Sequence, residues 1–228
     1  MQSLLQELPE FLGYYNLYFL IEAALTTVAL SAIGCIFGAL AGFTIAILRH
    51  TCTWVLLLPR IFAVIFTEFF RRVPFLVTLM LCFFSFQLAG IDLSLFAVAA
   101  VSVALIASAF LAEIMRAGLE SVHRNQWDAA ASMNFGLIGT IVHIILPQAW
   151  KVILPPAFGF FVLFIKDTAL ASQIGVIELT YAGKVLNNKG FSAALVFGTV
   201  LFLYFAISYP LSRLGAYLER RLALSRHR

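Results

Sequence analysis

The sequence predicts an all-helical integral membrane protein with five transmembrane helices. Hydrophobic residues make up 62% of the 228 residues and charged residues only 11%, whereas soluble domains have about 45–50% apolar and about 25% charged residues. The chain therefore has too few charges to cover a surface that faces water. This composition excludes soluble enzymes, nucleic-acid-binding domains and disordered tails.

Five apolar segments are expected to cross the bilayer, since a spanning helix needs about 20 residues. Four of them carry no charge: residues 23–48, 73–91, 93–112 and 191–212. The fifth, at about 151–171, contains Lys166 and Asp167. We expect its helix to have Pro155 and Pro156 in its first turn, because proline suits a first turn better than a helix interior.

Basic residues predict the orientation of the chain. No Lys or Arg precedes Arg49, whereas arginines follow the first and third spans and are frequent in the C-terminal tail. Because basic residues are enriched on the cytoplasmic side, we expect the N-terminus outside and the C-terminus in the cytoplasm. Lys184 and Lys189 would then lie outside, but the arginines of the tail outnumber them.

The chain is expected to form a single transmembrane domain over residues 1–228. Residues 1–18 are interpreted as an interfacial segment without a cleaved signal peptide, because the start has no basic region. Residues 113–150 are interpreted as a cytoplasmic connection. The three cysteines form no close-spaced motif, so neither a metal site nor a cofactor is predicted.

Three glycines at four-residue spacing, Gly34, Gly38 and Gly42, line one face of the first span. Small residues at this spacing allow a neighbouring helix to approach closely. That neighbour is either another helix of the chain, which we favour, or a second subunit.

Charged residues within apolar stretches are candidates for function, because burying them in a membrane is unfavourable. Glu68, Arg71 and Arg72 precede Pro74, which should kink their helix. Their spacing allows a helical ion pair, and the alternative is a belt of charges at the membrane surface.

Lys166 and Asp167 are adjacent and point about 100° apart on a helix, so they do not face each other. Glu178 follows at the expected outer end. Each of these residues either joins a structural ion pair between helices or contacts a solute.

Residues 126–133 are predicted to form a short helix outside the membrane. Asn125 is a good N-cap, and Asp128 suits a capping box. Asn134 readily adopts the left-handed conformation that ends a helix. Such a helix is either a docking feature or part of an ordinary connecting loop.

The segment WDAAASMNFGLIGTIVHIILPQA resembles the EAA loop of ABC importer permeases. Asp128, Ala129, Ala130, Leu146 and Pro147 occupy the matching positions, and Asn134 replaces the loop glycine. The resemblance implies an ATPase-coupling loop made of Asp128, Ala129, Ala130, Asn134, Gly136, Leu146 and Pro147.

Further blocks resemble one branch of that family, the polar amino-acid permeases of histidine/glutamine type. These blocks are EFFRRVPFLVTL, AEIMRAGLESV, KDTALASQIGVIELT and PLSRLGAYLERRL. The resemblance extends from about Ala24 to Leu222, and the blocks occur in the family's order. It implies the type I importer permease fold in a bacterial cytoplasmic (inner) membrane.

By this resemblance the chain is expected to be a permease subunit of an ATP-driven importer for polar amino acids. It is not expected to be an enzyme, because no P-loop sequence occurs and ATP would be hydrolysed by a partner. The implied partners are an ABC ATPase dimer, a second permease subunit (identical or similar) and an extracellular or periplasmic amino-acid-binding protein. Asp167 and Glu178 are candidates for the solute ammonium group, and Lys166 and Arg71 for its carboxylate.

Two other functions remain open at this point. Glu68, Asp167 and Glu178 could serve as relay sites in a proton- or ion-coupled carrier, although the chain lacks the internal repeat that such carriers usually have. The chain could also be a membrane anchor for an ATPase that transports nothing itself.

Overall fold

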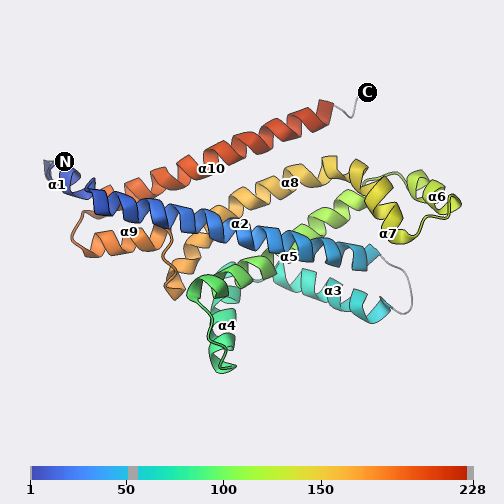
Figure 1. Cartoon of the computed structure of the whole chain (residues 1–228), viewed down its shortest axis with the longest axis horizontal. Helices are drawn as coiled ribbons and strands as arrows, with labels where there is room; N and C mark the ends of the chain where they lie inside the picture. Colours follow the sequence, from blue (N-terminus) through green and yellow to red (C-terminus); the bar gives the residue numbers. More distant parts are fainter. Residues whose placement is uncertain (1, 51–55, 225–228) are drawn as a thin grey trace. The chain divides into compact units, whose positions relative to one another are not determined.

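A computed structural model describes residues 2–50 and 56–224, and every regular element in these ranges is a helix (Figure 1). The elements are α1 (Gln2–Phe11), α2 (Tyr14–His50), α3 (Leu57–Phe70), α4 (Phe75–Leu88), α5 (Leu95–Glu120), α6 (Arg124–Ser132), α7 (Leu137–Thr140), the π-helix η2 (Ile141–Ile145), α8 (Leu146–Asp167), the 3₁₀ helix η3 (Thr168–Ile174), α9 (Leu179–Asn188) and α10 (Ala193–Leu224).

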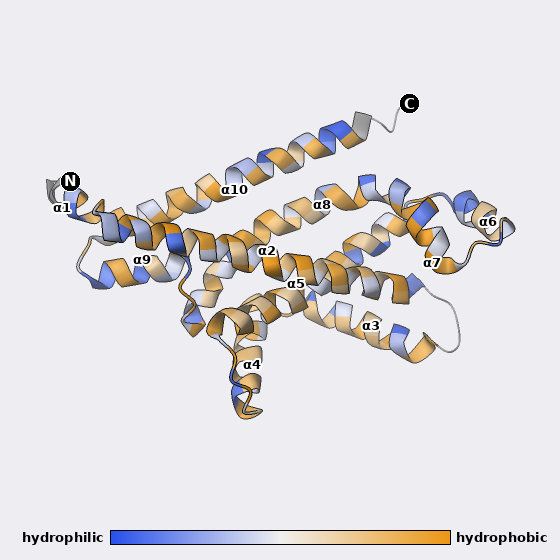
Figure 2. Ribbon diagram, in the orientation of Figure 1, coloured by the Kyte–Doolittle hydropathy of each residue, from blue (hydrophilic) through white to orange (hydrophobic). Residues whose placement is uncertain are grey.

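Four helical stretches are long and apolar enough to cross a membrane: Tyr14–His50, Leu95–Glu120, Leu137–Ile174 and Ala193–Leu222. Helices α3 and α4 provide a fifth crossing only if they are counted as one broken span. Hydrophobic residues dominate α2 and α4, whereas hydrophilic residues gather on α6 and at the end of α10 (Figure 2). The predicted all-helical membrane fold is therefore confirmed.

Pro74 breaks the helix where a kink was predicted, and the predicted span 73–91 contains only the 14-residue helix α4 (Phe75–Leu88). Helix α3 ends at Phe70, and Pro74 takes the N-cap position of α4 with extended backbone angles (φ −60°, ψ 140°). Since proline has no N–H and disfavours a helical residue before it, the helix stops and restarts instead of bending smoothly.

The predicted start of the fifth span is wrong, because Pro155 and Pro156 lie inside α8 and not in its first turn. Each proline leaves one carbonyl of the preceding turn without its helical donor, and these belong to Lys151 and Val152. Both of these residues are exposed, and the helix continues past them to Asp167. Transmembrane helices tolerate proline where such groups find other partners.

The chain divides into two compact units. The first unit contains residues 1–36, 73–104 and 161–210, and the second contains residues 37–72, 105–160 and 211–228. The long helices α2, α5, α8 and α10 each contribute residues to both units.

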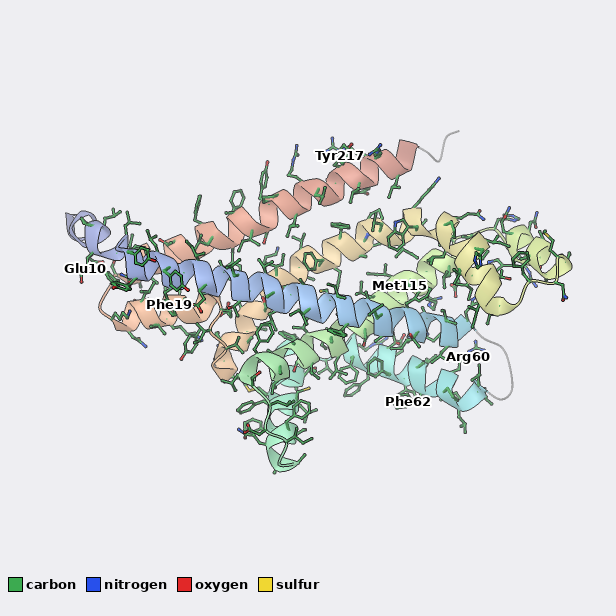
Figure 3. The ribbon with its side chains drawn as sticks, viewed as in Figure 1. Glu10, Phe19, Arg60, Phe62, Met115 and Tyr217 are labelled. Atoms are coloured by element: carbon green, nitrogen blue, oxygen red, sulfur yellow. The ribbon has the colours of Figure 1, made fainter. Side chains whose placement is uncertain are left out.

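The core of the first unit is built by α1, α2, α9 and α10. Its buried residues are Phe11, Leu20, Ala23, Ala182, Leu186 and Val196, with Phe19 packed against them (labelled in Figure 3). A carboxylate oxygen of Glu7 accepts the backbone N–H of Ser192 at 2.8 Å. Helix α1 is therefore held against the loop before α10, and the prediction that residues 1–18 lie at the membrane surface stays a prediction.

The core of the second unit joins the ends of several helices. Its buried residues are Leu119, Ile141, Ile145, Ala149 and Ile153, and the partly buried Phe43, Ile47, Met115 and Trp127 pack against them. These residues come from α2, α5, α6, η2 and α8.

Close contacts between α2 and α5 explain the glycine stripe. A Cβ atom on Gly34 would collide with Val103 in the first unit. In the second unit, a Cβ on Gly38 would collide with Ala107, and one on Gly42 would lie 2.9 Å from the backbone of Ala112. The three glycines thus face a helix of the same chain, which is the packing interpretation.

Large apolar side chains are also exposed on the surface of the protein. Phe62 on α3 is 69% exposed and Tyr217 on α10 is 57% exposed (Figure 3). In a membrane protein such side chains face lipid or another subunit.

Candidate functional site

The N-terminus of α6 differs from the prediction. The N-cap is His123, whose Nδ1 atom accepts the backbone N–H of Asn125 at 3.2 Å. Asn125 therefore lies inside the first turn, and the predicted cap and the capping box with Asp128 are both wrong. The physical reason is tertiary: α6 is placed by Trp127 and Ala130, which pack inward, and this placement starts the helix earlier.

The C-terminus of α6 confirms the prediction for Asn134. This residue has a left-handed backbone (φ 58°). Its N–H donates to the Ala131 carbonyl at 3.0 Å, and the Phe135 N–H donates to the Ala130 carbonyl at 3.0 Å. These two hydrogen bonds form a Schellman motif, in which glycine or asparagine is the preferred left-handed residue.

The two neighbouring alanines of α6 differ in exposure, because they point about 100° apart on the helix. Ala130 is 1% exposed and belongs to the inner face with Trp127, whereas Ala129 is exposed together with Asp128. The outer face of α6 thus carries polar or small side chains. Its inner face is fixed by packing.

A turn and a further helical segment follow α6. Gly136 is the N-cap of α7, and its carbonyl accepts the Thr140 N–H at 2.9 Å. The chain then forms the π-helix η2, in which the Leu146 N–H donates to the Ile141 carbonyl. Pro147 has no N–H to continue α-helical hydrogen bonding, so a wider turn before it is favoured. Leu146 packs against the second-unit core.

The four candidate solute residues are divided between the two units. Lys166, Asp167 and Glu178 belong to the first unit and Arg71 to the second. Only three of the four candidates therefore lie in one compact part of the fold.

Lys166 and Asp167 lie where α8 narrows to η3. Lys166 is exposed and Asp167 half-buried, and neither side chain forms a hydrogen bond or ion pair within residues 2–50 and 56–224. The next residue, Thr168, is fully buried and donates its hydroxyl to the Ile165 carbonyl at 2.8 Å. The junction therefore holds a partly buried carboxylate without a partner in the described chain.

Glu178 is completely buried, with 0% exposure. Its carboxylate caps α9 by accepting the N–H groups of Thr180 at 3.0 Å and Tyr181 at 2.8 Å. The Tyr204 hydroxyl donates to it at 2.6 Å. Burial raises the pKa of the Glu178 carboxyl above its ordinary value, although these donors act in the opposite direction.

Arg71 is engaged within the second unit. Its guanidinium lies 3.7 Å from the carboxylate of Glu113 on α5 and 6.0 Å from the centre of the Phe110 ring. The neighbouring Arg72 pairs instead with Glu68, four residues earlier, which is the helical ion pair that the spacing allowed.

Sequence reasoning missed Glu113 and Arg49. The two side chains pair at 2.8 Å, with Arg49 only 11% exposed. Their positions in apolar helices were a signal, but nothing in the sequence indicates that the end of α2 meets α5. The described residues hold no cluster of three side chains suited to a metal ion.

Comparison with known proteins supports one family. Residues 56–224 match the family described as binding-protein-dependent transport system inner membrane component. The chain is 32% identical over 218 residues to the probable glutamine ABC transporter permease protein GlnP of Bacillus subtilis (strain 168), covering 93% of this chain and 99% of that protein. It is 31% identical over 207 residues to the glutamine transport system permease protein GlnP of Escherichia coli (strain K12). This match covers 90% of this chain and 93% of that protein.

Solved structures share the fold. The crystal structure of an amino acid ABC transporter with histidines has a TM-score of 0.79 and 27% identity, covering 89% of this chain and 94% of that chain. A chain of the inward-facing MetNI methionine ABC transporter has a TM-score of 0.77 at 19% identity. The match covers 92% of this chain and 99% of that chain. The latter similarity concerns the fold alone.

Proposed function

Since the chain belongs to the family of binding-protein-dependent transport system inner membrane components, we propose that it is half of the translocation path of an amino-acid importer and receives force through α6. The coarser function, permease component of an amino-acid ABC importer, follows from its relatives and its fold. Its relatives are permease subunits of ABC transporters, so in this proposal a partner ATPase hydrolyses ATP.

The observation that supports coupling is the two-faced packing of α6. Asp128 and Ala129 are exposed, so the outer face offers a small surface that a partner protein can approach closely. On the inner face, Ala130 is buried and Trp127 packs against a core shared by α2, α5 and α8. A push on α6 is therefore transmitted to several membrane helices as a rigid-body movement.

The proposed assembly contains a second permease subunit, an ATPase dimer on the cytoplasmic side and a solute-binding protein outside. The exposed apolar side chains of α2 and α10 suit contact with lipid or a second permease. In this arrangement the N-terminus lies outside, the C-terminus lies inside, and the complex is in the bacterial inner membrane.

The proposed solute is a polar amino acid. Asp167 and Lys166 support this choice because they place opposite charges at one helix junction without partners in the described chain. The carboxylate suits an ammonium group and the amine suits a carboxylate. Glu178 and Arg71 are already engaged by Tyr204 and Glu113, so we leave them out of the proposed solute contacts.

Ala129→Glu tests the coupling face, because it adds a large charged group to the exposed side of α6 without touching the core. We expect the variant to insert into the membrane but to lose its co-purifying ATPase. Ala194→Glu, at an exposed position in the first turn of α10, is the matched control and keeps the ATPase bound. Normal ATPase attachment to the Ala129 variant would contradict the assignment.

Uptake by the reconstituted complex tests the solute. Radiolabelled L-glutamine, L-histidine and L-cystine are the probes, with and without ATP. We expect ATP-dependent uptake that Asp167→Asn reduces at least tenfold while the ATPase stays bound. Gradient-driven uptake by the purified chain without ATPase would favour a carrier instead.

A further inference from the structure

We propose that Glu113 is the joint through which movement of α6 reaches the break between α3 and α4. This inference rests on the proposed function, in which α6 receives the force. It assigns a positioning role to Glu113, Arg49 and Arg71, which the coupling loop does not include.

Arginines from three segments of the second unit contact the carboxylate of Glu113. Arg49, at the end of α2, donates from Nη1 to Oε2 at 2.8 Å. Arg116, one turn later on α5, donates from Nη2 to Oε1 at 2.5 Å and from Nε to Oε2 at 3.2 Å. Arg71, directly after α3, lies 3.7 Å from Oε2. One carboxylate thus holds α2, α5 and the end of α3 together.

The same end of α2 touches α6. His50, the neighbour of Arg49, places its ring 4.4 Å from the Trp127 ring. Trp127 lies on the inner face of α6, and Ile47, one turn earlier on α2, packs against the same core. A shift of α6 therefore moves the end of α2, and with it the arginine that binds Glu113.

Arg71 connects Glu113 to the broken span. It is the first residue after α3 and precedes the N-cap Pro74 of α4 by three positions. Its guanidinium also lies over Phe110 of α5, whose ring stacks on Phe160 of α8 at 5.2 Å. The position of the α3 end is thus set by contacts to α5, and through Phe110 to α8.

The three arginines differ in their distance from Glu113 and in their exposure, so one contact can break while the other two persist. Arg49 and Arg116 lie within hydrogen-bonding distance of Glu113 and are 11% and 27% exposed. Arg71 is the most distant and 34% exposed, so its charge can turn to water at low cost. In the proposed cycle Arg49 and Arg116 stay on Glu113, whereas Arg71 leaves and returns as α2 moves.

The test follows the distance between α3 and α5 in the complex with the co-purifying ATPase. Spin labels replace the exposed Leu58 on α3 and Ala117 on α5, in a background whose three cysteines are serines. Distances are measured with and without ATP plus vanadate. We expect a nucleotide-dependent shift in the parent complex that Arg71→Gln and Glu113→Gln both abolish, with no further effect of the double variant.

The control and the readout of transport separate this role from simple stabilisation. Glu120→Gln removes the 52%-exposed partner of Arg116, and we expect it to preserve the shift. L-Glutamine imported per ATP should fall at least tenfold in the Arg71 variant while ATP hydrolysis and ATPase attachment persist. Since Arg71 is one-third exposed, its variant is expected to fold even if the Glu113 variant does not.

Each outcome is informative. The proposed role of Glu113 would be contradicted if the nucleotide-dependent shift survives in Arg71→Gln. It would also be contradicted if the parent complex binds the ATPase but shows no shift. In both cases the proposed docking at α6 would stand. If no ATPase co-purifies with the parent chain, the proposed function fails, and the inference fails with it.

Discussion

The imidazole ring of His50 packs against the indole ring of Trp127, with centroids 4.4 Å apart and planes inclined by 32°. This contact joins the last residue of α2 to the inner face of α6. The polar helix α6 is therefore held by a membrane-spanning helix of the same chain as well as by its connections along the sequence.

Removing this ring contact should loosen α6. An aromatic pair contributes about 1 kcal/mol, so we expect His50→Ala to speed hydrogen exchange of α6 amides about 5-fold. Exchange mass spectrometry of the purified chain measures this effect. His143 is exposed on η2, and its Nδ1 lies 3.1 Å from the Gly139 carbonyl. It provides the control, because His143→Ala should leave α6 exchange unchanged.

The left-handed residue at the end of α6 predicts opposite effects for two substitutions. Asn134→Gly should preserve or slightly raise helix stability, since glycine has no Cβ penalty at φ 58°. Asn134→Val should lower it by about 1–2 kcal/mol or more, because a branched side chain is strained there. Circular dichroism melts and ATPase co-purification measure both variants. Equal behaviour of glycine and valine would contradict the assigned cap.

The crossing of α2 and α5 predicts a steric effect at Gly42. A Cβ at this position would lie 2.9 Å from the Ala112 nitrogen, so Gly42→Ala should destabilise the fold by about 1–3 kcal/mol. At Gly198, within α10, no described atom lies within 4 Å of an added Cβ, and Gly198→Ala should be neutral or stabilising. Thermal unfolding in detergent compares the two. A stable Gly42 variant would show that the helices can separate without loss.

The buried carboxyl of Glu178 predicts both a loss of stability and a pH dependence. Tyr204→Phe removes the hydroxyl that donates at 2.6 Å and should lower stability by about 1–3 kcal/mol, because the buried carboxylate loses one of its three hydrogen-bond donors.

The pH effect follows from the raised pKa of Glu178 in the folded chain. The folded state then holds this proton more tightly than the unfolded state. The stabilisation is present below the ordinary Glu pKa of about 4.3 and is lost as pH rises through the raised value. We expect melting temperatures of the parent to fall over that window, and Glu178→Gln to flatten the curve. An identical slope in both proteins would assign the pH effect to other groups.

Local sequence is sufficient to identify the apolar segments and the points where they break. Uncharged runs define the spans because a helix buried in lipid can carry few charges. Pro74 stops a helix and Asn134 ends one because these effects depend on the backbone of a few neighbouring residues. The glycine stripe of α2 was recognised for the same reason, since its spacing alone puts Gly34, Gly38 and Gly42 on one face.

The partners of these segments depend on how the helices pack against one another. The cap of α6 moved from Asn125 to His123 because packing of Trp127 and Ala130 places the helix. Ala129 and Ala130 look equivalent in the sequence, yet one is exposed and the other buried. The pairing of Arg49 with Glu113 joins residues 64 positions apart. Contacts of this kind depend on how helices are placed in space, and the sequence pattern of a single helix carries no record of that placement.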